Sequence, residues 1–262
     1  MIRSVLLALL LVLPGAAARA EPPPARLGFA IYAAGLNVMV IDSQADIGPD
    51  AYRIDLAYRS TGLFGTLFPT TIDSVAHGTW SGIEARPQRF ASWGTLRSGP
   101  RRITIEYVAG QPALRELEPA SEEDRDGVPP DMQRNTIDTL SAMAFLVRSV
   151  AETGRCDGQV RSFDGRRVIE ITARTAGRET LRSDYRSSFA GPALRCDFAG
   201  RQLAGFKRDV SESERKRINE SSAWLAPIVP GQPALPVRIV FETRFFGNAT
   251  AFLTAAVPGV RR

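Results

Sequence analysis

Short stretches in which apolar and polar residues alternate constrain the fold of this chain more than any other feature of its sequence. The clearest example has apolar side chains at every second position, at Tyr52, Ile54, Leu56 and Tyr58. A period of two residues is typical of a strand that buries one face. Similar stretches occur at 29–32, 36–41, 102–108, 168–171, around Tyr185, at 237–245 and at 250–257. Because Gly, Pro, Asp and Ser separate them rather than helices, they predict a large antiparallel sheet.

One segment has the period of a helix. Asn135 is placed to cap a helix over about 136–152, and Asp138 supports its first turn. Apolar residues recur at helical spacing at Ile137, Leu140, Ala144, Val147 and Ala151, and Met143, Leu146 and Val150 widen this face. Gly154 is expected to end the helix. So broad an apolar face predicts a helix buried against the sheet. The expected fold is therefore mainly β (β-rich α+β), a large curled antiparallel sheet or half-barrel packed on one main helix.

The first twenty residues have the pattern of a secretory signal peptide. The basic residue Arg3 precedes an apolar run at 5–13, and Ala18 and Ala20 are small residues at the positions that a signal peptidase reads. The run is too short to span a membrane, and no later run is long enough. We expect cleavage after Ala20, no transmembrane segment afterwards, and a single β-rich domain over 21–262 in a bacterial periplasm.

The two cysteines agree with export. An even number of cysteines in an exported chain predicts a disulfide, here between Cys156 and Cys196. The bond would close a loop of roughly 40 residues, which is worth about 4 kcal/mol in the chain-entropy model. The alternative is a redox pair, but the C-x-x-C spacing is absent. Two cysteines and one histidine do not complete a zinc site without carboxylates.

The sequence carries no recognisable catalytic constellation. His77 is the only histidine, and the stretch at 78–82 beside it is not a G-x-S-x-G elbow, so no nucleophile and base are paired. The acidic residues from Glu122 to Gly127 resemble the start of a calcium loop, but Gln133 stands where the final Glu is needed. No glycine-rich phosphate loop is present. We therefore expect no enzymatic activity, no catalytic residue, no metal and no cofactor. A hydrolase based on carboxylates is the least favoured alternative.

Charge and composition limit the partners. With 44% hydrophobic and 23% charged residues, the composition is that of a globular protein and excludes a disordered chain. The formal charge is +5, and it falls to +3 when the leader is removed with Arg3 and Arg19. The basic residues are almost all arginine, in clusters at 101–102, 166–167 and 215–217. Export excludes nucleic acid, and scattered clusters are more typical of solvated edges than of a binding surface.

Three motifs, taken in order along the chain, resemble a known family. They are Tyr32-Ala33-Ala34-Gly35-Leu36, then Thr136-Ile137-Asp138-Thr139-Leu140-Ser141-Ala142, then Cys156 followed by Phe163-Asp164-Gly165-Arg166-Arg167 and a later Cys196. Their order and spacing resemble the bacterial exported proteins grouped as domain of unknown function 3108, from about Gly28 to about Leu253. Thr139 and Val168 depart from the pattern, which has Pro and an aromatic residue there. The resemblance implies a periplasmic β-rich domain, similar in shape to the half-barrels of lipoprotein carriers, and it supplies no catalytic residue.

The residues that carry this resemblance have structural interpretations of their own. They are Tyr32, Gly35, Asp138, Asp164, Gly165 and Arg166. Gly35 permits a bulge or a close backbone approach in a strand that runs from 29–32 into 36–41. Asp164 and Gly165 predict a hairpin turn, and Asp138 is an anion near the positive end of a helix. We favour these roles over ligand contacts.

Two functions fit these observations. The first is a non-enzymatic periplasmic protein of the cell envelope that binds a lipid or another hydrophobic small molecule within the curled sheet. The second is an envelope protein that acts through a surface for a protein partner and has a dry core. Both remain open, because an apolar interior can either pack on itself or enclose a ligand.

Overall fold

Residues 22–120, 125–243 and 247–261 are described by the computed structural model. Within these ranges, thirteen strands form one antiparallel sheet in the order β7-β6-β5-β4-β3-β2-β1-β13-β12-β11-β10-β9-β8. The first half consists of β1 (Ala25–Ala33), β2 (Leu36–Ile47), β3 (Ala51–Ser60), β4 (Thr71–Ser81), β5 (Glu84–Leu96), β6 (Gly99–Val108) and β7 (Gln111–Glu118). The second half consists of β8 (Gly158–Phe163), β9 (Val168–Leu181), β10 (Gly191–Ala204), β11 (Ile218–Ala226), β12 (Leu235–Thr243) and β13 (Gly247–Pro258). The expected mainly-β fold, a curled antiparallel sheet that does not close, is confirmed.

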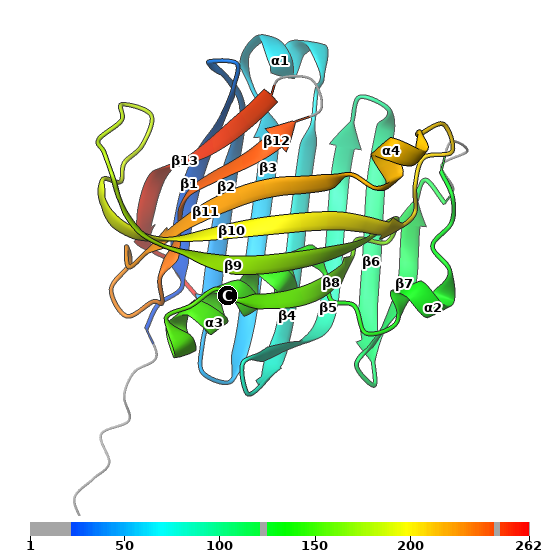
Figure 1. The fold of residues 1–262 in the computed structure, drawn as a ribbon, viewed down its shortest axis with the longest axis horizontal. Coiled ribbons are helices and arrows are strands. Elements are labelled where there is room, and N and C mark those ends of the chain that lie inside the picture. Colours follow the sequence, from blue (N-terminus) through cyan, green and yellow to red (C-terminus); the bar gives the residue numbers. More distant parts are fainter. Residues whose placement is uncertain (1–21, 121–124, 244–246, 262) are drawn as a thin grey trace, which may run out of the picture.

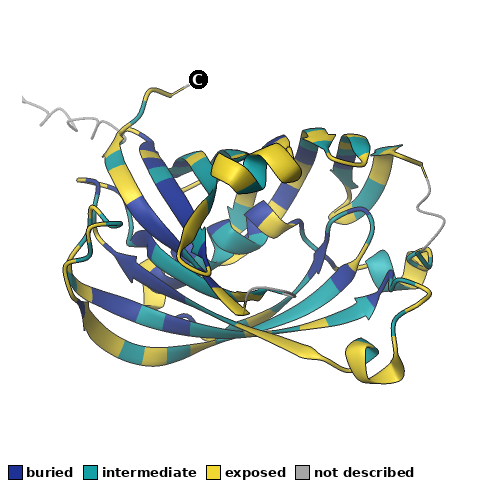
Figure 2. Ribbon diagram, turned by 90° about the horizontal axis from the view of Figure 1, so that it is seen from above, coloured by how far each residue is buried: buried dark blue, intermediate teal, exposed yellow. Residues whose placement is uncertain are grey.

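Two meanders meet at the centre of this sheet. Each strand pairs with its neighbour in sequence, except where the first strand meets the last: β1 pairs with β13 from Ala25↔Pro258 to Ala33↔Ala249. Strands β8 to β12 cross over the strands of the first half (Figure 1). Seen from above, the two halves form two layers (Figure 2). The sheet therefore folds over itself, and its concave face becomes the inside of the molecule.

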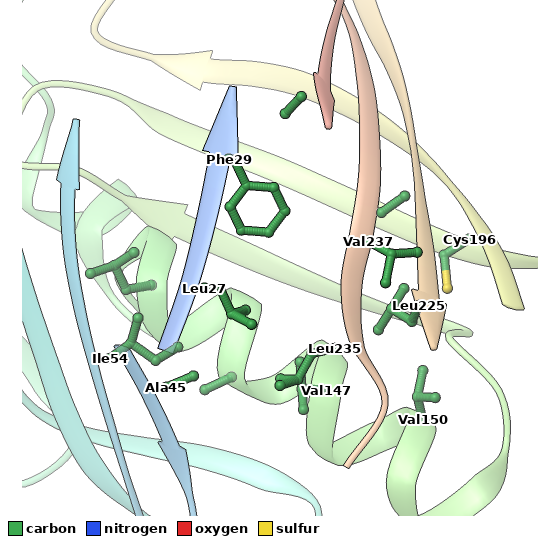
Figure 3. Close-up of a cluster of buried hydrophobic side chains, with 14 of the residues drawn as sticks. Leu27, Phe29, Ala45, Ile54, Val147, Val150, Cys196, Leu225, Leu235 and Val237 are labelled. Atoms are coloured by element: carbon green, nitrogen blue, oxygen red, sulfur yellow. The ribbon is translucent and has the colours of Figure 1, made fainter. Parts of the chain in front are cut away.

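The main helix, α3 (Thr139–Thr153), lies between the layers; α1 (Gly62–Leu67), α2 (Pro130–Gln133) and α4 (Glu212–Arg215) are short. Figure 3 shows Val147 and Val150 of α3 beside core residues from both halves of the sheet. Those labelled from the first half are Leu27, Phe29, Ala45 and Ile54, and those from the second half are Cys196, Leu225, Leu235 and Val237. Their fractional exposures are all below one tenth, so one core joins the two layers through the helix.

The helix begins three residues later than the sequence pattern predicts. Asp138 is the N-cap, and its side chain accepts a hydrogen bond from the backbone N–H of Ser141 at 2.9 Å. Asn135 does not cap the helix, because its backbone has φ +56° and its side chain bonds to Gln111. Ile137 is extended, since it pairs with β8 through the backbone of Arg161 and Phe163. The expected end is present: Gly154 has the left-handed φ of +70°.

Besides Ile137, Ala151 was wrongly predicted to lie on the buried face of this helix. Leu140, Ala144, Val147 and Val150 are buried, but Ala151 is exposed. The helix turns its last residues toward solvent, so the apolar stripe ends with Val150.

Two further expectations are wrong. The strand predicted to continue past Gly35 is two strands, because Ala34 and Gly35 form the tight turn between β1 and β2 with φ values of +48° and +81°. Two positive φ values match the twist of a two-residue hairpin, so Gly35 serves a turn and not a bulge. The stretch around Tyr185 is not a strand: it lies in the connection between β9 and β10, and Tyr185 is 91% exposed.

The gap between the two ends of the sheet is covered by a hairpin and a linker. The turn between β8 and β9, at Asp164 and Gly165, packs against the inner side of β6 and β7. A Cβ atom on Gly165 would lie 2.9 Å from Ile103 and within 4 Å of Leu114 and Leu117. Residues 125–137 run from β7 to α3, and Ile137 bridges to Ser162 of the edge strand β8. Edge strands are protected from pairing with other chains by such covers.

The expected disulfide joins Cys156 to Cys196. Cys156 follows α3, and Cys196 lies in the middle of β10, so the bond attaches the end of the helix to the second half of the sheet. Both residues are buried. No redox pair is needed to account for them.

Some predictions concern residues that the structure does not describe. The predicted signal peptide, 1–20, lies outside the described residues, as do Glu122 and Asp124 of the acidic stretch and Phe245. No helix in the described part of the chain has the length and hydropathy needed to cross a membrane.

Loss of the disulfide should destabilise the protein. Replacing both Cys156 and Cys196 by alanine should lower the free energy of unfolding by about 4 kcal/mol, because the unfolded chain regains the entropy of an open loop. Denaturant unfolding of both proteins measures this difference. Mass spectrometry under non-reducing conditions should show two protons fewer than the free thiols require, and a full thiol mass would contradict the bond.

Gly165 should be more sensitive to substitution than an ordinary turn glycine. Gly165→Ala places a side chain at φ +84° against Ile103, whereas Gly82→Ala, in the β4–β5 turn at φ +63°, meets nothing within 4 Å. Both variants should lose about 1–2 kcal/mol from the left-handed backbone. Gly165→Ala should lose about 1 kcal/mol or more beyond this, from overpacking. Equal losses in denaturant unfolding would show that the hairpin does not press on β6.

Candidate functional site

An apolar cleft of about 390 Å³ lies between α3 and the concave face of the second half of the sheet. Five elements besides the helix contribute to its walls, from β8 to β12. Its apolar lining residues are Ala142, Met143, Phe145, Leu146, Val160, Ile169, Ile171, Ala173, Phe198, Ala223, Pro236, Ile239 and Phe241. A concave, mostly apolar space of this size is typical of sites for small hydrophobic molecules.

Helix α3 can line the cleft because it has two apolar stripes. Leu140, Ala144 and Val147 form the first, which is buried. Met143 and Leu146 belong to the second, and they remain half-buried where they face the cleft. A helix apolar over so wide an arc must be covered on both sides. One stripe is covered by the sheet, and the other forms one wall of the cleft.

The opposite wall follows from strand alternation. Ile169, Ile171 and Ala173 of β9 all line the cleft, while Glu170 between them pairs with Arg201 on the outer face at 3.0 Å. Ile239 and Phe241 of β12 line it in the same way. The sequence pattern had marked Ile169, Ile171, Ile239 and Phe241 as one-sided strands. It gave no signal for Phe198 and Gly200 of β10, since no clear alternation surrounds them.

The cleft continues toward the first half of the sheet. A second apolar space, of about 60 Å³, shares Met143, Pro236 and Ile239 with it. Its other lining residues include Leu27, Phe29, Ile41, Ile54 and Leu56 of β1 to β3. Met143 therefore stands where the cleft meets the deep core, and its flexible side chain is suited to an adaptable wall.

A separate hollow of about 510 Å³ adjoins the cleft on the other side of Phe145 and Val160. Its charged residues are of both signs, Glu84, Arg86, Arg161 and Glu170. Three of these are paired, Arg86 with Glu84 and Glu170 with Arg201. Among the described residues the hollow therefore carries two charges of each sign, whereas apolar side chains predominate in the cleft.

A buried hydrogen-bond chain holds the start of α3. The hydroxyl of Tyr52 donates to Oγ of Ser141 at 2.7 Å, and Ser141 donates to Oδ2 of Asp138 at 2.6 Å. Asp138 is fully buried, and this burial raises the pKa of its carboxyl to about 6. Burial likewise raises the pKa of Tyr107, whose hydroxyl is buried nearby. The chain anchors the helix to β3, and Asp138 is not open to the cleft.

The residues singled out from the sequence lie in three separate places. Tyr32 is on the outer face, where its ring meets Phe252 edge-on at 5.8 Å and lies under the guanidinium of Arg186 at 5.6 Å. Gly35 is in the adjacent hairpin turn. Asp138 caps α3, and the third group forms the tip of β8 and β9. The structure does not bring these residues together into one site.

The tip of the β8–β9 hairpin is held by its own side chains. Oδ1 of Asp164 accepts hydrogen bonds from the backbone N–H groups of Arg166 and Arg167. Arg166 reaches the carbonyl of Pro119 at 2.8 Å, just after β7. These contacts attach the second half of the sheet to the far end of the first.

His77 and the acidic stretch at 122–127 were the candidates for chemistry that the sequence offered. His77 lies in β4, and its Nδ1 is 3.3 Å from the side-chain oxygen of Gln88 on β5. Among the residues that the structure describes, no group of three or more His, Cys, Asp or Glu side chains could hold a metal ion. Asp126, from the acidic stretch, pairs with Arg208 and Arg215.

Comparisons with known proteins identify a family and a fold. A family model described as "Protein of unknown function (DUF3108)" matches residues 28–254, which confirms the resemblance found in the sequence. The chain is also similar to a solved structure, that of a β-barrel-like protein of domain of unknown function DUF1849 from Brucella abortus. That match has 12% identity and a TM-score of 0.52, and it covers 90% of this chain and 98% of the other. At this identity the likeness concerns the fold alone. No curated protein matches the sequence.

The buried Asp138 should make stability depend on pH in an unusual direction. A carboxyl whose pKa rises from 3.8 to about 6 on folding holds a proton that the unfolded chain releases earlier. The free energy of unfolding should therefore fall as pH rises from about 4 to 7, by about 3 kcal/mol relative to Asp138→Asn. Denaturant unfolding at each pH measures the difference between the two proteins.

The matched control for this test is Asp131→Asn, which removes the exposed carboxyl of Asp131 in α2. It should follow the wild-type curve. If Asp138→Asn also runs parallel to wild type from pH 4 to 7, the buried carboxyl does not hold its proton in the folded state.

Proposed function

Because the chain belongs to the DUF3108 family of proteins of unknown function, which assigns it no activity, we propose its function from the cleft beside α3. The protein is a non-enzymatic periplasmic component of the cell envelope that binds a lipid or another hydrophobic small molecule. The molecule lies between α3 and the concave face of β8 to β12.

The observation that carries this proposal is the open apolar space itself. In a dry core, Met143, Phe198 and Ile239 would pack on one another at the density of a crystal. Here they line a cleft of about 390 Å³ instead. Apolar walls left in contact with water are unfavourable, and a hydrophobic ligand removes that cost by covering them.

Export is supported by two observations. The first twenty residues have the pattern of a cleavable leader. The disulfide between Cys156 and Cys196 is of the kind that persists in oxidising compartments. The periplasm provides such a compartment, and lipids must cross it in water-soluble complexes.

The absence of an enzymatic role is part of the proposal. The charged residues that line the cleft are Arg167, Glu220 and Glu242. Glu242 is paired with Arg217 at 3.0 Å, and Glu220 is exposed on β11. The buried Asp138 is occupied as a helix cap, with Ser141 as its partner. A carboxylate hydrolase would need one of its two acidic groups to be held protonated as the acid, and neither environment favours that.

A partner surface is the second candidate, and an exposed apolar patch favours it. Leu36, Leu63, Leu67 and Phe68, on α1 and the adjacent start of β2, are 62%, 70%, 55% and 41% exposed. Apolar patches of this kind mark contact surfaces for other molecules. This candidate does not require the cleft, so the two proposals can be tested separately.

The first experiment is to purify the mature protein from a native periplasm and extract it for mass spectrometry of small molecules. A stoichiometric lipid or other hydrophobe supports the binding function and gives its chemical class. A protein that is empty and also fails to bind added hydrophobes would contradict it, and cross-linking would then test the partner surface.

Filling the cleft should abolish binding without unfolding the protein. Gly200 lines the cleft, and a Cβ atom there would meet its nearest neighbours at 3.6 Å or more, which is ordinary contact. Gly200→Phe should therefore weaken binding of the neutral fluorescent probe N-phenyl-1-naphthylamine by about tenfold or more. Fluorescence titration measures the affinity.

The matched control is Ala199→Phe, one residue earlier on the same strand. Ala199 is exposed, and strand alternation turns its side chain to the outer face. This variant should bind the probe as wild type does. Equal binding by both variants, with unchanged melting temperatures, would place the ligand elsewhere.

A further inference from the structure

We infer that the ligand is an amphiphile with an anionic headgroup, whose chain lies in the apolar cleft and whose headgroup lies in a basic hollow at its mouth. This inference rests on the proposed function and specifies the ligand class. The hollow has a volume of about 230 Å³ and contains Arg125, Arg167, Lys207 and Arg217 in its walls.

The hollow adjoins the cleft. They share four lining residues, Arg167, Gln202, Asn219 and Glu242. Arg167 directly precedes β9, Gln202 is near the end of β10, Asn219 near the start of β11, and Glu242 near the end of β12. Because neighbouring strands are antiparallel, the start of one strand lies beside the end of the next. These four positions therefore lie side by side, along one row of strand ends. A ligand in the cleft therefore emerges among these side chains.

Positive charge predominates in the hollow. Of the described residues that line it, four are cationic and two, Glu214 and Glu242, are acidic. Arg217 pairs with Glu242 at 3.0 Å, and Arg167 pairs with Asp164 at 2.7 Å. The excess of cationic residues is counted over all the described residues that line the hollow. The inference does not require any one of their side chains to be unpaired.

Two further arginines lie beside the hollow. Arg208 and Arg215 both lie close to a single carboxylate, that of Asp126, at 3.7 and 3.5 Å. Among the described residues, two guanidinium groups therefore share one carboxylate beside the hollow. Guanidinium groups present N–H donors in a planar fork that suits phosphate and carboxylate oxygens.

The hollow beyond Phe145 and Val160, which adjoins the middle of the cleft, does not offer such a site. Two acidic and two basic residues line it among those described, so it favours neither sign of charge. The direction of the ligand follows from this difference: the headgroup lies at the basic end, and the chain points toward Met143 and the deep core.

The cleft also has the length that a chain requires. Its lining on β9 extends from Arg167 to Ala173, which at the rise of a strand is about 20 Å. The side chains change along this path from charged to apolar, with Ile169 and Ile171 between the two ends. This is the polarity profile of a single-chain amphiphile.

The test uses amphiphiles that share one chain and differ in headgroup charge. Dodecyl phosphate, dodecyl maltoside and dodecyltrimethylammonium are titrated, below their micellar concentrations, into the purified mature protein in a calorimeter. Dodecyl phosphate should bind about tenfold more tightly than the other two, and added salt should reduce its advantage. Inorganic phosphate alone should bind far more weakly than dodecyl phosphate, because it gains nothing from the cleft.

The variant for this test is Lys207→Gln combined with Arg217→Gln. The Arg217 side chain is 47% exposed, so its replacement should leave the fold intact, which the melting temperature checks. The double variant should lose most of the preference for dodecyl phosphate, while its affinity for N-phenyl-1-naphthylamine stays unchanged. Lys216→Gln is the matched control: its side chain is 75% exposed, pairs with Glu212 and does not line the hollow.

The outcomes separate this inference from the proposed function. If all three dodecyl compounds bind equally, or the double variant keeps the preference, the cleft binds hydrophobes but the basic hollow does not select the headgroup. If inorganic phosphate binds as tightly as dodecyl phosphate, the hollow is an anion site without a chain. If neither the amphiphiles nor the neutral probe bind, the binding function itself is wrong.

Discussion

The pairing of β1 with β13 is the interaction on which the rest of this structure depends. It joins two antiparallel meanders, β1 to β7 and β8 to β13, into one sheet with a single concave face. Each meander alone would expose an apolar face to water, and neither could bury it without the other. Because the paired strands are the first and the last, the sheet forms only when both ends of the chain are in place. Contacts so distant in sequence carry a high entropic cost and are typical of slow folding.

Helix α3 makes the folded-over sheet stable without filling it. Its buried stripe packs in the core between the layers, and its N-terminus is tied to β3 through Asp138, Ser141 and Tyr52. The disulfide attaches its C-terminal end to β10. With both ends held, the second apolar stripe faces an open cleft rather than collapsing onto β9 and β12. The rigidity of the helix is therefore what keeps the cleft open.

Closure of the molecule is achieved by side chains rather than by strand pairing. The ends of the sheet, β7 and β8, are not hydrogen-bonded to each other in the described ranges, yet the hairpin tip at Gly165 presses on Ile103 and Arg166 binds the carbonyl of Pro119. The incomplete closure leaves the apolar interior open at the edge where Arg167 lies. The cleft is lined by charged and polar residues where Arg167 and Glu242 lie and by apolar residues around Met143 and Ile171, and this difference gives it its polarity.

The sequence by itself determined the class of structure: the alternation at Tyr52 to Tyr58, the helical period from Leu140 to Val150 and the cysteine pair predicted the sheet, its helix and its disulfide. The two periodic patterns are local, and a strand or a helix is the regular structure that places their apolar residues on one face. The turn at Gly35 was missed, because a glycine in an apolar stretch also fits a bulge, and the helix was started three residues too early, because Ile137 pairs with the edge strand β8. Only the tertiary structure decided whether the apolar faces meet or leave a cleft. That outcome depends on how far apart α3 holds Met143 from Ile239, a distance set by contacts with distant strands, and no local pattern of residues encodes it.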